Sequence, residues 1–294
     1  LKEESVVGPL GHKVRARYAK LKEDSAIIEM AESSGLELLS SGERDPFRTT
    51  TYGVGELILA ALDAGARKIY VGIGGSATND GGAGMAQALG ISLQDHSGRE
   101  IGYGAGSLEH LARIDLSNLD KRIQDTEFIV LSDVNNPLTG PQGASWIYGG
   151  QKSAVGQDLA TLDSLLEHYG QLVSATIGRN FMEEEGAGAA GGLGFALMAF
   201  CGAQVFSGSE VILELLGLEK EILGADLVIT GEGKMDTQTN KGKAPYGVVQ
   251  IAKKHRIPVI AIVGSVVSYD KVYLSGIDLV LDIINRPMSL DEAM

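Results

Sequence analysis

The feature that most constrains this 294-residue chain is a regular alternation of apolar and amphipathic segments near its C-terminus. The apolar segments DLVIT, PVIAIVG and DLVLDII (residues 226–230, 258–264 and 278–284) have the composition of buried strands. Between them, APYGVVQIAKKH (244–255) and YDKVYLSG (269–276) have the pattern of helices. Strands joined by helices in this way form parallel sheets, whose ligands bind at the carboxyl ends of the strands. The sequence therefore predicts an α/β fold with its functional residues in the loops that follow strands.

The same alternation is present earlier in the chain. A helix is expected within TTTYGVGELILAALDAG (49–65), ending at Gly65, and a buried strand at KIYVGI (68–73). Further on we expect a short helix at MAQAL (85–89), a strand at EFIVLSD (127–133) and a helix near 159–168. The first 50 residues contain KVRARYA and SAIIEMA, which predict strands or a hairpin. The length fits two domains.

The composition excludes several classes of function. The chain has 25 Lys and Arg against 38 Asp and Glu, and its net charge of -13 argues against nucleic-acid and anionic-membrane partners. The single cysteine, Cys201, cannot form an internal disulfide, which favours a reducing, cytoplasmic location. The longest uncharged stretch, Gly186–Ser209, is interrupted by glycines and Gln204, so we expect no membrane span.

The segment GIGGSATNDGGAG (residues 72–84), named here the glycine-rich segment, directly follows a predicted strand. Its start matches the dinucleotide pattern GxGxxA, and Asp95 lies near the distance expected of a ribose-binding acid. Its later glycines disfavour the helix that this NAD site requires. We therefore favour a nest of backbone N–H groups around a phosphate or carboxylate, with an ordinary turn as the alternative. The expected binding residues are Gly74, Gly75, Ser76, Thr78, Asn79 and Asp80.

A second candidate loop is GEGKMDTQTNKGKAPYGV (231–248), which follows the strand DLVIT. Glu232 and Asp236 could hold Mg²⁺ or accept a hydroxyl proton, and Lys234, Lys241 or Lys243 could neutralise phosphate charge. A helix beginning near Pro245 would add its dipole to an anion site. The alternative is a solvated charged loop.

Two more loops are rich in glycine or asparagine. SDVNNPLTGPQGAS (132–145) offers Asp133, with Asn135 and Asn136 close by, for hydroxyl or metal binding, but a turn built by Asn136-Pro137 and Gly140-Pro141 explains it equally well. For GAGAAGGLG (186–194) close packing is slightly favoured over ligand contact. The five histidines are scattered, and the chain contains no GxxxxGK[ST], HExxH, CxxC or GxSxG motif. The residues alone therefore predict an α/β enzyme that binds a small anion or a phosphate group.

Taken in order, GIGGSATNDGGAG, SDVNNPLTGPQGAS, GAGAAGGLG and GEGKMDTQTNKGKAP resemble the type I glycerate kinase family. The resemblance runs from about Val7 to the C-terminus and includes EMAESSGLELL and TTTYGVGELILAALDAG. It implies a Rossmann-like parallel-sheet domain and a second α/β domain of different topology, with the active site between them. We expect residues 51–89 and 201–294 in the Rossmann-like domain and residues 1–50 and 90–200 in the second.

The sequence departs from the family pattern in two respects. YGGQKSA (148–154) replaces the family's Tyr/Phe-Gly-Pro-Gln-Lys-Gly-Ala but keeps Lys152. The family's first strand, its Asp-Ser-Phe-Lys and Asp-Gly-Gly-Glu-Gly segments and its last helix have no counterpart here, so we expect a fragment.

The resemblance implies transfer of the γ-phosphoryl group of MgATP to D-glycerate, commonly at the 2-hydroxyl. We expect Asp236 or Asp133 to orient or deprotonate that hydroxyl, and Lys243 or Lys152 to stabilise charge on the phosphoryl group. Glu232 is expected to help hold Mg²⁺. The binding set comprises Gly74, Gly75, Ser76, Thr78, Asn79, Asp80, Asn135 and Thr237.

The expected partners are glycerate and ATP, and a homodimer is an option. The alternatives are an anion-binding module without catalysis and an NAD-dependent dehydrogenase. The sequence does not decide whether the 2-hydroxyl or the 3-hydroxyl of glycerate is phosphorylated. It also does not decide whether the glycine-rich segment binds glycerate or ATP.

Overall fold

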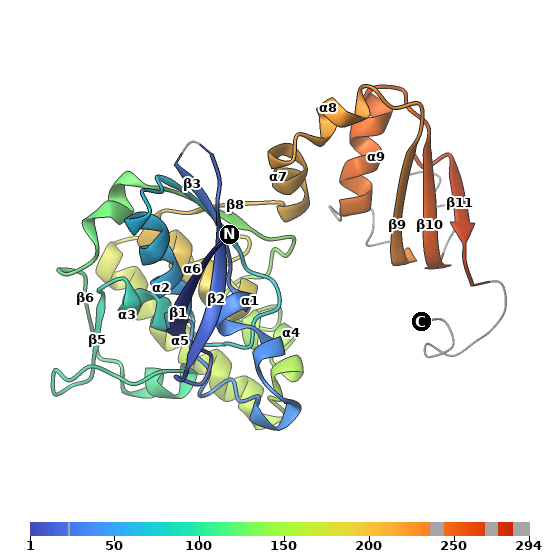
Figure 1. Cartoon of the computed structure of the whole chain (residues 1–294). Coiled ribbons are helices and arrows are strands. Elements are labelled where there is room, and N and C mark those ends of the chain that lie inside the picture. Colours follow the sequence, from blue (N-terminus) through green and yellow to red (C-terminus); the bar gives the residue numbers. More distant parts are fainter. Residues whose placement is uncertain (23, 236–243, 268–275, 285–294) are drawn as a thin grey trace. The chain divides into compact units, whose positions relative to one another are not determined.

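The computed structural model describes residues 1–22, 24–235, 244–267 and 276–284. The chain divides into two compact units, Leu1–Phe206 and Ser207–Met294, named here unit 1 and unit 2 (Figure 1). No helix among the described residues is long and apolar enough to cross a membrane.

Unit 1 is built on a six-stranded sheet in the order β1-β2-β3-β4-β7-β8. The strands β3, β4, β7 and β8 are mutually parallel, and β1 and β2 add an antiparallel hairpin at one edge. The bounds are β1 (Lys2–Val7), β2 (Lys13–Lys20), β3 (Ser25–Glu29), β4 (Lys68–Gly72), β7 (Glu127–Leu131) and β8 (Gln204–Phe206); β5 (Ser92–Gln94) and β6 (Arg113–Asp115) form a separate antiparallel pair. Buried β-branched residues such as Ile69 and Val71 explain why β4 lies inside the sheet.

Helices cover this sheet and bury its apolar side chains. They are α1 (Ala31–Ser34), α2 (Tyr52–Asp63), α3 (Ala83–Ala88), α4 (Ala144–Tyr148), α5 (Gln157–Ile177) and α6 (Ala189–Cys201), with 3-10 turns η1 (Leu36–Leu38), η2 (Ser41–Glu43), η3 (Ala105–His110), η4 (Lys121–Asp125) and η5 (Gly150–Lys152). The helix α2 buries Val54, Leu57, Ile58, Ala61 and Leu62 at helical spacing. These residues share one continuous core with Met85 of α3 and Phe195 of α6.

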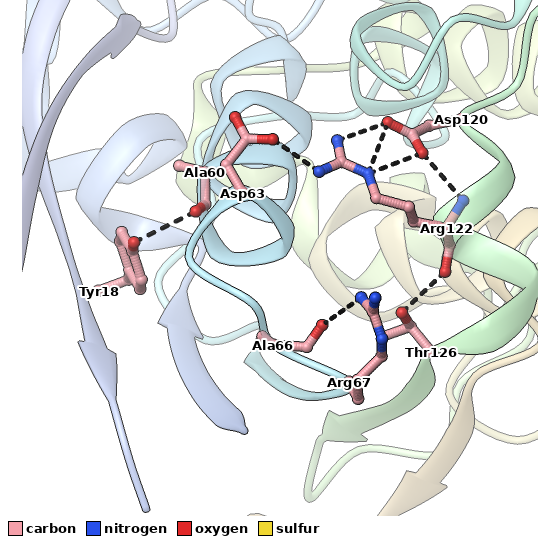
Figure 2. A network of polar contacts seen from close by, with 8 residues as sticks. All are labelled: Tyr18, Ala60, Asp63, Ala66, Arg67, Asp120, Arg122 and Thr126. Atoms are coloured by element: carbon pink, nitrogen blue, oxygen red, sulfur yellow. Dashed lines mark hydrogen bonds and ion pairs between the residues drawn. The ribbon is translucent and has the colours of Figure 1, made fainter. Parts of the chain in front are cut away.

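An arginine near the start of β7 ties α2 to the sheet. Arg122 forms ion pairs with Asp120 at 2.7 Å and with Asp63, the last residue of α2, at 2.6 Å (Figure 2). The backbone carbonyl of Arg122 accepts a hydrogen bond from the Thr126 hydroxyl, one residue before β7 (Figure 2). The end of α2 and the entry to β7 are therefore held together, which fixes where β7 begins.

Unit 2 is a three-stranded parallel sheet in the order β11-β10-β9 (Figure 1). Its elements are α7 (Gly208–Leu215), α8 (Leu218–Ile222), β9 (Val228–Met235), α9 (Ala244–Lys254), β10 (Val259–Val266) and β11 (Leu279–Asp282). Alternate strand residues such as Val259, Ala261 and Val263 are buried and form a second core with Ile222, Val249 and Ala252.

The α/β class with a mostly parallel sheet is confirmed, as are the expected strands and helices that fall within the described residues. The loop expected directly after DLVIT begins later than predicted, because backbone pairing with β10 extends β9 as far as Met235. The helix expected at 244–255 is confirmed as α9 (Ala244–Lys254). The helix expected at 269–276 lies almost entirely outside the described residues.

The division into units also differs from the domains expected from the sequence. Residues 51–89 are part of unit 1 rather than of the C-terminal unit, because β4 pairs with both β3 and β7. A strand followed by a glycine-rich loop carries no information about which sheet the strand joins, and only the pairing partners reveal it.

Candidate functional site

The carboxyl ends of the parallel strands in unit 1 bring together the loops that the sequence singles out. β3 ends at Glu29, β4 at Gly72 and β7 at Leu131, and these three residues lie in register across the sheet. Glu29 is followed by α1, Gly72 by the rest of the glycine-rich segment, and Leu131 by the loop 132–143. This edge is where ligands of open α/β sheets bind.

The outer part of the glycine-rich segment is accessible at this edge. Gly74 and Gly75 are exposed, and Ser76 is 6% exposed. The segment is held by hydrogen bonds from Leu36 N–H to the Gly75 carbonyl and from Ala77 N–H to the Ser34 carbonyl, both 2.9 Å. Within the described residues, the N–H groups of Gly74, Gly75 and Ser76 donate to no acceptor. Gly75 has φ of 70°, a conformation that favours glycine. These groups form the accessible part of the predicted nest.

The inner part of the segment is buried, and Asp80 lies at its centre. Thr78, Asn79 and Asp80 are all fully buried. The Asp80 carboxylate accepts hydrogen bonds from the Thr51 N–H and hydroxyl, at the start of α2, and from the Gly82 and Gly84 N–H groups, at the start of α3. Burial raises the pKa of Asp80, and these four hydrogen bonds oppose that effect. Asp80 therefore joins two helix N-termini, and its carboxylate is not exposed to a ligand.

Lys152 lies beneath the same segment instead of facing solvent. Its side chain is fully buried, and its Nζ donates a 2.6 Å hydrogen bond to the Thr78 carbonyl. Burial lowers the pKa of Lys152 to about 7, partly offset by the negative charge of Asp80. Nearby, Asn79 Nδ2 donates to Ser145 Oγ at 2.9 Å, whereas Asn79 Oδ1 and Thr78 Oγ1 are buried without a partner. Lys152 in this structure supports the loop from inside.

The segment GAGAAGGLG packs against the glycine-rich segment, as the sequence slightly favoured. Ala190, Gly191 and Gly192 have φ of 53°, 67° and 91°, and the Gly191 carbonyl accepts a hydrogen bond from Gly81 N–H. A Cβ atom on Gly191 would lie 2.0 Å from the Thr78 carbonyl oxygen. Glycine at this position is therefore required by contact between the two loops.

The loop after β7 presents its polar residues in two ways. Asp133 and Asn135 are exposed at the sheet edge. Asn136, a candidate from the sequence both for ligand binding and for a turn, donates to the Gln142 carbonyl and accepts a 2.6 Å hydrogen bond from the Tyr148 hydroxyl. Asn136 therefore shapes the loop, while Asp133 and Asn135 are exposed at its surface.

Glu29 is a candidate that sequence analysis missed. It is the last residue of β3 and pairs in register with Gly72. A Cβ atom on Gly72 would lie 2.6 Å from Glu29 Oε2, so the carboxylate lies against the backbone that leads into the glycine-rich segment. Partial burial, with the nearby negative charge of Glu32, raises the pKa of Glu29. One feature of the sequence could have pointed to Glu29. It is an acidic residue at the end of the apolar strand SAIIE, and the candidate ligand-binding loops of this chain all follow strands.

The candidates in unit 2 divide between described and undescribed residues. Glu232 lies within β9, paired in register with Val263. Asp236, Thr237 and Lys243 lie outside the described residues. Among the described residues, no group of three or more His, Cys, Asp or Glu side chains forms a metal cluster.

Comparison with known proteins decides the family. The sequence model of the "Glycerate kinase family" matches residues 1–294. The chain is 49% identical over 294 residues to "Glycerate kinase" of Bacillus subtilis, covering 99% of this chain and 77% of that protein. It is 50% identical to "Glycerate 2-kinase" of Escherichia coli, covering 98% and 76%. The chain belongs to the glycerate kinase family.

A solved structure supports the same assignment. The "putative glycerate kinase 2 from Salmonella typhimurium LT2" superposes with a TM-score of 0.86 at 48% identity, covering 99% of this chain and 77% of that one. Membership in the glycerate kinase family agrees with the path of the chain after β4. Residues 73–82 form a loop and α3 begins only at Ala83, so no helix starts where a dinucleotide motif would need one.

Proposed function

We propose that this chain is a glycerate kinase that transfers the γ-phosphoryl group of ATP to the 2-hydroxyl of D-glycerate, giving 2-phosphoglycerate. The observation that carries the proposal is the unit 1 sheet edge, where the N–H groups of Gly74, Gly75 and Ser76 donate to no acceptor in the described structure and the Glu29 carboxylate lies against Gly72, two residues before them. Phosphoryl transfer requires an anion cradle and a group that accepts the hydroxyl proton. Relatives named glycerate kinase and glycerate 2-kinase supply the substrate and the position of transfer.

The proposed roles follow from accessibility. The N–H groups of Gly74, Gly75 and Ser76 bind an anionic group, either the glycerate carboxylate or ATP phosphate oxygens. Glu29 or Asp133, both at the carboxyl ends of strands, accepts the hydroxyl proton. Lys152 is a positioning residue, since its buried Nζ supports the Thr78 carbonyl.

The roles that the sequence predicted for the remaining candidate residues stay predictions. Thr78, Asn79 and Asp80 shape the inner half of the glycine-rich segment, while Asn135 remains a predicted substrate contact. Asp236 and Lys243 are the alternative proton acceptor and phosphoryl-stabilising cation, and Thr237 a further phosphate contact. A cytoplasmic location and a homodimer are proposed as well, and sedimentation velocity tests the latter.

We propose Mg²⁺ as the metal partner of ATP, with Glu232 as the protein residue that helps hold it. The fit rests on the donor chemistry: Mg²⁺ in kinases is bound through one or two carboxylates plus substrate phosphates, and no multi-residue cage is needed. The described residues offer no such cage. When bound, Mg²⁺ neutralises phosphate charge.

The test is ADP formation from ATP and D-glycerate, with the product identified by ³¹P NMR. Because the chain covers 77% of the Bacillus subtilis relative, the assay uses both this chain and a version flanked by the segments of that relative outside the matched region. Glycerate-dependent ADP formation with 2-phosphoglycerate as product is expected. Glycerate-dependent reduction of NAD would favour a dehydrogenase instead, and ATP or glycerate binding without turnover in either version would favour an anion-binding module.

A further inference from the structure

A cavity in unit 1 is lined by two arginines that have no ion-pair partner among the described residues. The cavity, of about 440 Å³, is named here the arginine pocket. Its walls are the segment 42–48, which follows the start of η2, and the residues Ser153, Ala154 and Asp158 around the start of α5, with Leu10 at the edge. Arg44 and Arg48 both line it.

Neither arginine of the pocket has its charge paired within the described residues. Three carboxylates, those of Glu43, Asp45 and Asp158, line the same cavity, yet none forms an ion pair with Arg44 or Arg48. A guanidinium presents a fork of donors that matches a carboxylate. The pocket is therefore suited to an anion brought by a ligand.

The carboxylates in the walls restrict which anion fits. Asp45 uses Oδ1 to accept from Phe47 N–H, and Asp158 uses Oδ2 to accept from Val155 N–H, which leaves one oxygen of each without a donor in the described structure. A polyphosphate would be repelled by these charges. A small monoanion with hydroxyl groups would place its carboxylate on the arginines and donate its hydroxyls to the free oxygens.

The arginine pocket is also connected to the glycine-rich segment on both sides. Thr49, the residue after Arg48, donates its hydroxyl to the Ala77 carbonyl at 2.9 Å. Lys152, the residue before Ser153, donates to the neighbouring Thr78 carbonyl at 2.6 Å. Residues next to the two walls of the pocket thus donate hydrogen bonds to the consecutive Ala77 and Thr78 carbonyls of the glycine-rich segment. Ser153 has φ of 74°, an unusual conformation for a residue with a side chain.

We propose that the arginine pocket binds the carboxylate of the hydroxy-acid substrate, with Arg44 and Arg48 as specificity-determining residues. This rests on the proposed function for the identity of the acid. The pocket itself selects a small hydroxy acid over a nucleotide.

The experiment measures binding and turnover separately, on the full chain and on the version flanked as above. Calorimetric titrations with D-glycerate, D-lactate and inorganic phosphate are made on the wild type, on Arg44→Met, on Arg48→Met and on the double variant. Arg113→Met, an exposed arginine on β6, is the matched control. We expect at least tenfold weaker D-glycerate binding in each pocket variant, unchanged ATP binding, and wild-type behaviour of the control. Asp45→Asn and Asp158→Asn should reduce the preference for D-glycerate over D-lactate.

The outcomes separate the two proposals. Unchanged hydroxy-acid binding in the double variant, or no hydroxy-acid binding by the wild type, overturns the pocket assignment whatever the turnover. Arginine-dependent hydroxy-acid binding without phosphorylation supports the pocket and removes the kinase proposal. Circular dichroism of each variant shows whether the fold is kept, and Arg44→Lys, which retains the charge and loses the fork, should restore binding only in part.

Discussion

Replacing Lys152 by Met tests whether a buried lysine supports the glycine-rich segment. Methionine has a similar length and no charge, so the variant removes the hydrogen bond to the Thr78 carbonyl while keeping the volume. The carbonyl left without a donor costs about 1 to 3 kcal/mol of unfolding free energy at every pH.

A second, pH-dependent effect arises from the lowered pKa. Burial lowers the pKa of Lys152 to about 7, against an ordinary value of 10.5 that applies in the unfolded chain. Between these values the unfolded state binds more protons than the native state, so the wild type becomes more stable as the pH rises. From pH 6 to pH 9 the gain is about 2.5 kcal/mol, and it is absent from the methionine variant. The unfolding free energy of the wild type minus that of Lys152→Met should therefore rise by about that amount over the same range, whatever its sign at pH 6.

The assay is urea unfolding at pH 6, 7.5 and 9, followed by the fluorescence of Trp146. This is the only tryptophan of the chain and lies in α4, so it reports unit 1 alone. Lys121→Met, an exposed lysine in η4, is the control and should show a difference that does not change with pH. If the unfolding free energy of the wild type minus that of Lys152→Met stays constant or falls as the pH rises, the assignment of a buried lysine with a lowered pKa is refuted.

Three further variants test other parts of the site. Asp80→Asn replaces one carboxylate oxygen by an NH₂ group, which cannot accept a hydrogen bond from the N–H groups at the starts of α2 and α3. It should lower the unfolding free energy by about 3 kcal/mol in the same urea assay. Gly191→Ala should cost about 3 kcal/mol because its Cβ meets the Thr78 carbonyl, whereas Gly178→Ala, with a similar φ and open space, should cost about 1 kcal/mol; equal losses would contradict the close-contact argument. Glu29→Gln should lower kcat by about 10²-fold to 10⁴-fold with little change in the KM for glycerate, and an unchanged kcat would leave Asp133 or Asp236 as the proton acceptor.

The repeating elements of the fold could be predicted from the sequence because their signals are local. The strand KIYVGI and the helix within residues 49–65 each follow from their own composition and periodicity, and both are present as β4 and α2. The assignment of β4 to a sheet could not be predicted, because it depends on pairing with strands that lie about 40 to 60 residues away in the chain. Gly231–Met235 looked like a loop for the same reason, since its glycines and charges are tolerated by strand pairing with β10.

The candidate site shows a similar limit. Polar residues in a glycine-rich loop predict hydrogen bonding, but the sequence does not say whether the partner is a ligand or the protein. Gly74 and Gly75 lie at the surface and Ser76 is nearly buried, while Thr78 to Asp80 are fully buried a few residues later. Only burial distinguishes the two sets, and burial is set by α3, α5 and α6 packing around the segment.

The buried half of the segment explains how the exposed half can be rigid. A loop with so many glycines loses more conformational entropy on folding than an ordinary loop, and nothing in its own sequence would favour a single shape. Here Asp80 fixes the loop to two helix N-termini, Lys152 and Thr49 hold two consecutive carbonyls, and Gly191 packs against it. These contacts lie within the protein, so they are formed before any ligand binds. The N–H groups of Gly74 to Ser76 are then oriented in advance, and an anion that binds them does not have to order the loop. The buried Asp80 and Lys152 can thus be favourable for function as well as for stability, because their separate hydrogen bonds position an anion cradle that glycine alone could not hold.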